Sequence, residues 1–235
     1  MTFQHRFPAT SPALDRMSAM QILQRLSQIP VTLFLVALAV VAHVAGPLVL
    51  LLTIDLKNIS ILELHRVLTC HLLHWSADHL LWDLGMFAAL GTIAELTMPR
   101  RYRLTLLLAA LLIPVGVMLH HPELESYRGL SGIDTALFGL IVTDLLGRRL
   151  VERDRKSVLL FSLLLFGLLA KLATEIVWGT NIFVSDTSFV PVPLAHLIGA
   201  ATGLLLGAAA PWCSPPTQRR QLRCAGTVVG NGACP

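Results

Sequence analysis

Charged residues are scarce in this 235-residue chain: Asp, Glu, Lys and Arg make up 14% of it, whereas hydrophobic residues make up 54%. The mean hydropathy is +0.69. A soluble domain has about 25% charged residues. The shortage of charge therefore excludes an ordinary soluble domain and predicts a polytopic membrane protein.

The chain also lacks the marks of a secreted, disulfide-bonded protein. It has four cysteines; Cys70 has no obvious partner, and Cys213, Cys224 and Cys234 lie where thiols are expected to stay reduced, so no disulfide framework is predicted. The first 30 residues spread their arginines among polar and apolar positions, unlike a cleaved signal peptide. No repeat of fixed period stands out. A single domain is expected.

Apolar stretches predict six transmembrane helices, because a hydrocarbon core about 30 Å thick needs about 20 apolar residues per span. The predicted fold is an all-α membrane protein with a six-helix bundle over residues 31–212. A cytoplasmic segment, 1–30, precedes the bundle, and a cytoplasmic, poorly ordered tail, 213–235, follows it. The six spans are expected near residues 31–54, 79–97, 104–120, 130–147, 158–178 and 192–212.

Basic residues predict the orientation, since cytoplasmic loops accumulate Lys and Arg. With both termini in the cytoplasm, the outer segments hold only Lys57, Arg66 and Arg128. The net charge of +4 then reflects topology, and no nucleic-acid partner is expected. The inner segments hold the other basic clusters, among them Arg100, Arg101, Arg103, Arg148, Arg149, Arg153, Arg155, Lys156, Arg219, Arg220 and Arg223.

Three spans bring polar chemistry to one depth near the outer face. Ser131, in Gly129-Leu130-Ser131-Gly132, opens the fourth span, and His196 lies about four residues into the sixth. At 1.5 Å per residue both lie within roughly 10 Å of the surface, and His79 starts the second span. Ser131 is either a helix cap or a nucleophile beside unpaired backbone N–H groups that hold an oxyanion, with His196 as general base.

Small residues allow the fourth and sixth spans to meet, because close backbone approach in lipid needs Gly, Ala or Ser. Gly132 and Gly139 lie seven residues apart in one span. Gly199, Gly203 and Gly207 recur every fourth residue in the other. The alternative is that these glycines mark generic helix packing.

These segments resemble the rhomboid intramembrane serine proteases. Gly129-Leu130-Ser131-Gly132 with Ala136-Leu137-Phe138-Gly139 is similar to the family's G-x-S-G segment, and Ala195-His196-Leu197-Ile198-Gly199 with Gly203 to its A-H-x-x-G-x-x-x-G segment. The stretch from His74 to Asp83 is similar to H-x-x-x-x-H-x-x-x-N. The chain departs from the family at Asp83 (usually Asn), at His65-Arg66 (usually Trp-Arg) and at Thr135 (usually aromatic).

The resemblance implies that Ser131 is the nucleophile and His196 the base, without a third acidic member and without metal or cofactor. It further implies that His79 and the backbone N–H of Ser131 form the oxyanion hole, supported by Gly129 and Asp83. Asp83 either donates a hydrogen bond as a protonated acid or orients His79 as an acceptor. Substitution of Asp83 by Asn separates the two.

Within the family the chain looks closest to the rhombosortases, in length, in Asp83 and in Lys171 with Glu175. This implies a multi-pass protein of the bacterial inner membrane that cuts single-pass membrane proteins near the outer face, at C-terminal sorting segments containing Gly-Gly. Lys171 and Glu175, four apart, are expected to form an ion pair. Glu95 and Asp144 are expected to be interfacial or packing groups, and Asp134 lines a water-accessible cavity or has another role.

Two other classes remain open. His71, His74, His79 and Asp83 are possible ligands of a metal or haem, although His74 and His79 straddle the helix start. The second alternative is a non-catalytic rhomboid-like protein that binds membrane partners. Substitution of Ser131 by Ala distinguishes these alternatives from a protease.

Overall fold

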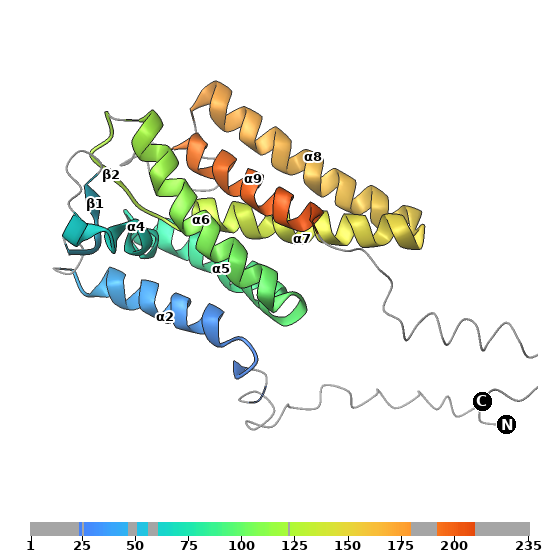
Figure 1. The fold of residues 1–235 in the computed structure, drawn as a ribbon, viewed down its shortest axis with the longest axis horizontal. Coiled ribbons are helices and arrows are strands. Elements are labelled where there is room, and N and C mark those ends of the chain that lie inside the picture. Colours follow the sequence, from blue (N-terminus) through green and yellow to red (C-terminus); the bar gives the residue numbers. More distant parts are fainter. Residues whose placement is uncertain are drawn as a thin grey trace, which may run out of the picture.

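The computed structural model describes residues 24, 26–46, 51–55, 61–121, 123–179 and 192–209. Six longer helices dominate this part of the chain (Figure 1). They are α2 (Pro30–Val44), α5 (Ala77–Thr97), α6 (Pro99–His120), α7 (Ser131–Glu152), α8 (Arg155–Trp178) and α9 (Pro193–Ala208). Each overlaps one of the six predicted apolar segments. The predicted tail, its three cysteines and most of the N-terminal segment lie outside the described residues.

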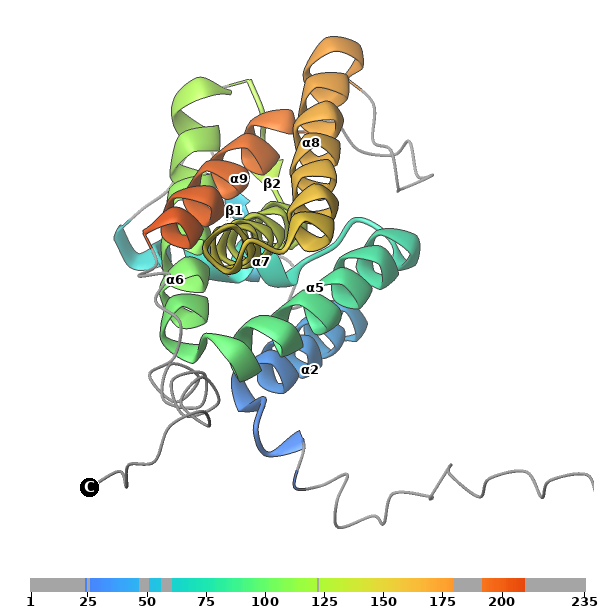
Figure 2. The same cartoon turned by 90° about the vertical axis from the view of Figure 1, so that its right-hand side faces the viewer.

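Helix α7 is the central helix of the bundle. Figure 2 looks nearly along its axis and shows α9, α8, α5 and α6 placed around it, and α7 contacts all four. Helix α2 lies outside this group, against α5. Because Ser131 begins α7, the candidate nucleophile stands at one end of the most enclosed helix.

The loops contain short elements that the sequence did not predict. Strands β1 (Ile54–Asp55) and β2 (Ser126–Tyr127) pair antiparallel, with Ile54 opposite Tyr127. Between β1 and α5 the chain forms η1 (Ile61–Glu63), α4 (Arg66–Thr69) and η2 (Cys70–Leu72). This small sheet joins the loop before α5 to the loop before α7 and is an addition to the predicted helical bundle.

The first predicted span, 31–54, is too long. Helix α2 ends at Val44, Gly46 has a positive φ of 41°, and Ile54 belongs to β1. A positive φ breaks a right-handed helix, and glycine adopts it without steric cost. The predicted span was too long because apolar residues continue in the sequence after α2 has ended at Val44.

Local sequence signals explain where several helices begin and end. The Ser76 hydroxyl accepts the N–H of His79 at the start of α5, and Asp154 accepts the N–H of Ser157 at the start of α8. Both are N-cap bonds. Helix α8 ends at Trp178 and is followed by Gly179 in the left-handed conformation, which is a usual way for a helix to terminate.

Glycines hold α7 and α9 backbone to backbone, as the sequence predicted. A Cβ on Gly199 would overlap the carbonyl oxygen of Gly132, and one on Gly203 would overlap that of Ala136. A Cβ on Gly139 would lie 3.3 Å from the backbone nitrogen of Leu204 in α9, which is close but not an overlap. The ends of α7 and α9 that carry Ser131 and His196 are thereby brought together.

Three of the described helices, α5, α6 and α8, are long and apolar enough to cross a membrane, and α2 and α9 are shorter apolar helices. Helix α7 carries ionisable groups near both ends, from Asp134 to Asp144 and Arg149. Asp144 is buried and pairs with Arg101 at 2.7 Å and Arg148 at 2.8 Å. The expectation that Asp144 is a packing group is confirmed.

Candidate active site

Ser131 does not cap α7. Ser131 is the first residue of the helix, and the residue at the N-cap position is Leu130. The side chain of Leu130 makes no capping hydrogen bond. Among the described residues no hydrogen bond of the Ser131 hydroxyl is found, and the residue is half-buried. The capping explanation is therefore wrong, and the hydroxyl is left available for another role.

The first turn of α7 is capped by Asp83 of α5. Oδ2 of Asp83 accepts the backbone N–H of Leu130 at 2.9 Å and that of Ser131 at 3.1 Å. Since an N–H group can only donate, this carboxyl oxygen is an acceptor here. The same N–H of Ser131 was expected to bind an oxyanion, so Oδ2 stands where an oxyanion would have to lie.

Two histidines converge on the same oxygen. Nε2 of His74 and Nε2 of His79 each lie 3.2 Å from Oδ2 of Asp83, which is within ion-pair distance. The two rings meet edge to face with centroids 5.1 Å apart. His79 and the N–H of Ser131, the two expected oxyanion donors, thus share one acceptor.

Gly129 lets the loop approach these groups. Its φ is 121°, a conformation that side chains rarely adopt, and a Cβ there would lie 3.1 Å from the His79 ring and 3.3 Å from Oδ2 of Asp83. Its carbonyl oxygen lies 3.1 Å from Nδ1 of His71. Glycine is required here for both backbone geometry and space.

His71, in η2, links this loop to α6. Its Nε2 lies 3.2 Å from the carbonyl oxygen of Ala110, on the opposite side of the ring from Gly129. Burial lowers the pKa of His71 below 6.5, and the two carbonyl groups oppose that shift. Tyr127, whose ring lies edge-on to His71, has a pKa raised by burial.

His196 is held through Nδ1. This nitrogen lies 2.7 Å from Oε2 of Glu175 in α8, and the residue is 9% exposed. Next to it, the carbonyl oxygen of Ala195 lies 3.1 Å from the position of a Cβ on Gly132. Gly132 and Ala195, the neighbours of Ser131 and His196, are thus in contact. In the part of the chain that the structure describes, no hydrogen bond joins Ser131 to His196.

The contact of Glu175 with His196 was missed by the sequence prediction. Lys171 and Glu175 form the expected i, i+4 pair at 2.7 Å, and Nζ of Lys171 also lies 3.3 Å from Nδ1 of His196. Glu175 is only 2% exposed. An acidic residue in an apolar segment, at a depth similar to that of His196, was the one signal that pointed to this contact.

Asp134 is buried one turn into α7. Its Oδ1 has no hydrogen-bond partner among the described residues. Its position beneath Ser131 is compatible with the lining of a polar cavity, and that role stays a prediction.

The histidines considered as metal ligands face carbonyl oxygens or Asp83. Both nitrogens of His71 face carbonyl oxygens, and His74 and His79 both face Asp83. Within the described ranges, no group of three or more His, Cys, Asp or Glu side chains is arranged to hold a metal ion. The hypothesis of a histidine-ligated metal or haem therefore finds no support in the site geometry.

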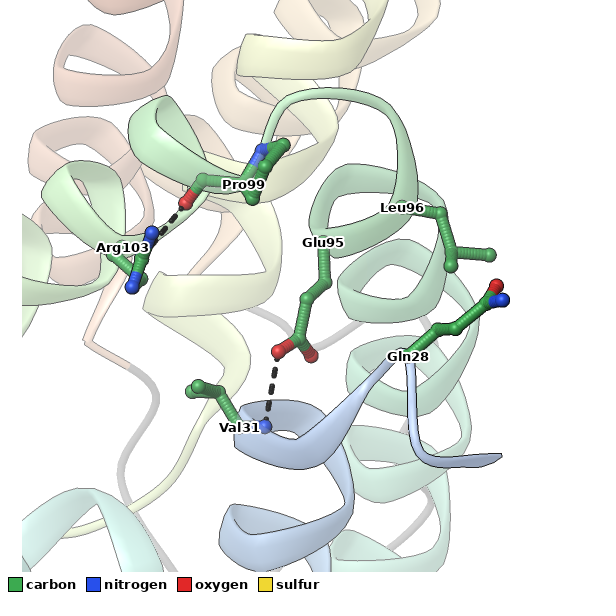
Figure 3. A pocket seen from close by; sticks show the side chains of 6 residues that line it. All are labelled: Gln28, Val31, Glu95, Leu96, Pro99 and Arg103. Carbon is green, nitrogen blue, oxygen red and sulfur yellow. Dashed lines mark hydrogen bonds between the residues drawn. The ribbon is translucent and has the colours of Figure 1, made fainter. Parts of the chain in front are cut away.

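A cavity of about 370 Å³ lies at the other end of α5 (Figure 3), lined by Gln28, Val31, Glu95, Leu96, Pro99 and Arg103. Glu95 accepts the N–H of Val31 at 3.0 Å and that of Thr32 at 2.9 Å. It therefore caps α2, which confirms a packing role. Sixteen helical residues separate Glu95 from His79, about 24 Å at 1.5 Å per residue, so this cavity is remote from Ser131.

Comparison with known proteins places these elements in one family. The model of the Rhomboid domain matches residues 62–212, which include Ser131, His196, His79 and Asp83. No curated protein matches the chain.

Proposed function

Because the chain belongs to the rhomboid family, we propose that it is an intramembrane serine endopeptidase with Ser131 as nucleophile and His196 as general base. Rhomboid proteins are generally intramembrane serine proteases. The observation that carries the proposal is the glycine-mediated contact of α7 with α9, which brings the starts of both helices together. Ser131 and His196 stand at those two starts.

The proposed reaction is acyl transfer to Ser131. Oγ attacks the carbonyl carbon of the scissile peptide bond while Nε2 of His196 takes its proton. When the C–N bond breaks, the imidazolium returns that proton to the leaving amine. A water molecule then attacks the acyl-enzyme, with His196 again taking and returning a proton, and Ser131 is regenerated.

The oxyanion of each tetrahedral intermediate is proposed to bind the N–H of Ser131 and His79. In the described geometry Oδ2 of Asp83 accepts that N–H at 3.1 Å, so the oxyanion must replace the carboxylate at this donor. Asp83 can keep the N–H of Leu130 at 2.9 Å while it does so. We propose that Asp83 acts as an acceptor that orders the loop and His79, and not as a proton-bearing donor.

The proposed substrates are single-pass membrane proteins cut near the outer face. In this proposal all six long helices span a bacterial inner membrane, with both termini in the cytoplasm. A locally unwound segment of small residues suits such a site, because an intact helix hides its carbonyl groups. Kinship with the rhombosortases favours a C-terminal segment with Gly-Gly, a hydrophobic stretch and a basic end.

The test is cleavage by purified protein in proteoliposomes of a tagged single-pass substrate with Gly-Gly before its hydrophobic segment. Wild type is compared with Ser131→Ala and His196→Ala. Ser157→Ala is the control, because that hydroxyl bonds to Asp154 at the far end of the bundle. Wild type and the control should cut, and the two active-site variants should not. Equal cleavage by all four proteins, or binding without cleavage by any, would overturn the proposal.

A second substrate tests the sorting-segment assignment separately. Replacing Gly-Gly by Leu-Leu should lower the rate, because it removes the flexible segment. An unchanged rate would contradict the Gly-Gly preference and leave the dyad standing.

A further inference from the structure

We infer that Glu175 is a positioning residue for His196, so that the site operates as a Ser-His-Glu arrangement and not as an isolated pair. The inference deepens the proposed function and rests on it. It departs from the expectation that the site has no acidic third member. Its basis is the 2.7 Å contact between Oε2 of Glu175 and Nδ1 of His196.

The contact selects one tautomer of the ring. An ionised carboxylate has no proton to donate, so a hydrogen bond at this distance requires Nδ1 to carry the proton. The remaining ring nitrogen, Nε2, then presents a lone pair, which is what a general base for the serine hydroxyl needs. In the opposite tautomer two lone pairs would face each other at 2.7 Å.

Lys171 supports the same arrangement. Its ammonium group lies 2.7 Å from Oε1 of Glu175, the carboxylate oxygen that does not bond to His196. It also lies 3.3 Å from Nδ1, but a nitrogen that donates to Glu175 has no lone pair in that direction to accept from lysine. Lys171 therefore fixes the carboxylate, and Glu175 fixes the ring.

Burial makes the contact effective. The side chain of Glu175 is 3% exposed and that of His196 11% exposed, so little water competes for the hydrogen bond. The carboxylate also stabilises the imidazolium that forms when Nε2 takes the serine proton. Because the two residues belong to different helices, the bond further sets how α8 lies against α9 at the site.

The kinetic test compares wild type with Glu175→Gln, Glu175→Asp and Lys171→Met on the same tagged substrate. Glu175→Gln can still fill the space, but its amide can turn an N–H toward Nδ1 and favour the wrong tautomer. We expect kcat to fall at least about 10²-fold with KM unchanged, as for loss of the acidic member of a triad. Glu175→Asp should recover part of the rate, and Lys171→Met should lose less than Glu175→Gln. Glu152→Gln, in an exposed pair with Arg149, is the matched control.

The spectroscopic test does not depend on cleavage of a substrate. The ¹⁵N shifts of labelled histidine in the wild-type protein, assigned by the signal that His196→Ala removes, report which ring nitrogen carries the proton. We expect Nδ1–H in wild type and a shift toward Nε2–H in Glu175→Gln. Nε2–H in wild type, or full activity of a folded Glu175→Gln protein, would overturn the inference while the dyad stood. Failure of wild type to cut any substrate would instead overturn the proposed function.

Discussion

Asp83 in α5 accepts the backbone N–H of Ser131 in α7, with 3.1 Å between Oδ2 and the nitrogen. The residue is 4% exposed, and its other backbone donor, Leu130, lies one residue earlier. A side chain from one helix thus satisfies the N-terminal donors of another, which otherwise remain unpaired. The start of α7 and the second predicted span are thereby locked together at the candidate site.

Asp83→Asn should keep the fold and lower kcat about tenfold. The amide oxygen can accept both N–H groups, but the charge that faces His74 and His79 is lost. Asp83→Leu should unfold at a clearly lower temperature, because each buried N–H left unpaired costs about 1–3 kcal/mol. Thermal unfolding in detergent and cleavage rates measure both effects. Wild-type activity of Asp83→Asn would favour the interpretation of Asp83 as a donor.

Gly199→Ala should destabilise the protein by roughly 1–3 kcal/mol, the usual range for an overpacked site, and abolish cleavage. Its new Cβ would overlap the carbonyl oxygen of Gly132, and a backbone atom cannot turn aside. Gly167→Ala in α8 is the control, since nothing lies within 4 Å of its Cβ position. It should be neutral or gain up to about 1 kcal/mol from helix propensity. Equal stabilities of the two variants in chemical denaturation would show that α7 and α9 are not in backbone contact.

Asp144→Ala should cost about 1.5–3 kcal/mol, because it removes the hydrogen bonds between a buried carboxylate and two arginines. Asp144 is 1% exposed and pairs with both Arg101 and Arg148. Glu152→Ala breaks an exposed pair with Arg149 and should cost no more than about 1 kcal/mol. Unfolding by denaturant in micelles checks the difference, and a cost at Asp144 as small as that at Glu152 would contradict the burial of Asp144.

His71 should make stability depend on pH. Because burial lowers its pKa in the folded protein below 6.5, the unfolded chain binds the proton more readily. The contribution of neutral His71 to the free energy of unfolding is fully present above pH 6.5 and is lost as the pH falls below that value. His71→Gln should be less stable than wild type at pH 7.5 but lose less on going to pH 5.5. His120→Gln, at an exposed position, should keep the wild-type slope, and an unchanged slope in His71→Gln would contradict the assignment.

The helices were predictable because apolar length dictates them. All six apolar segments became helices, and Gly132, Gly199 and Gly203 indicated which two would pack closely. The first prediction ran past Val44 because apolar residues continued beyond the helix. The pair β1 and β2 escaped notice because two-residue strands have no periodicity to detect.

The partners of charged groups were harder to predict. Asp83 was identified as important, but its residue type alone could not show that its partners are the N–H groups of Leu130 and Ser131. For Glu175, the ion pair with Lys171 four residues away already accounted for its charge, so a second partner was not predicted. Its second contact, with His196, depends on how α8 is rotated about its own axis, and that rotation follows from packing between helices and not from local spacing.

The central claim is that Ser131 is a nucleophile activated by His196, and reaction with a fluorophosphonate tests it most directly. The probe forms a covalent bond to the oxygen of an activated serine as fluoride leaves, and mass spectrometry of the digested protein locates the adduct. We predict labelling at Ser131 in wild type and in Ser157→Ala, none in Ser131→Ala, and a much slower reaction in His196→Ala. Labelling at another serine, or equal rates with and without His196, would contradict the account.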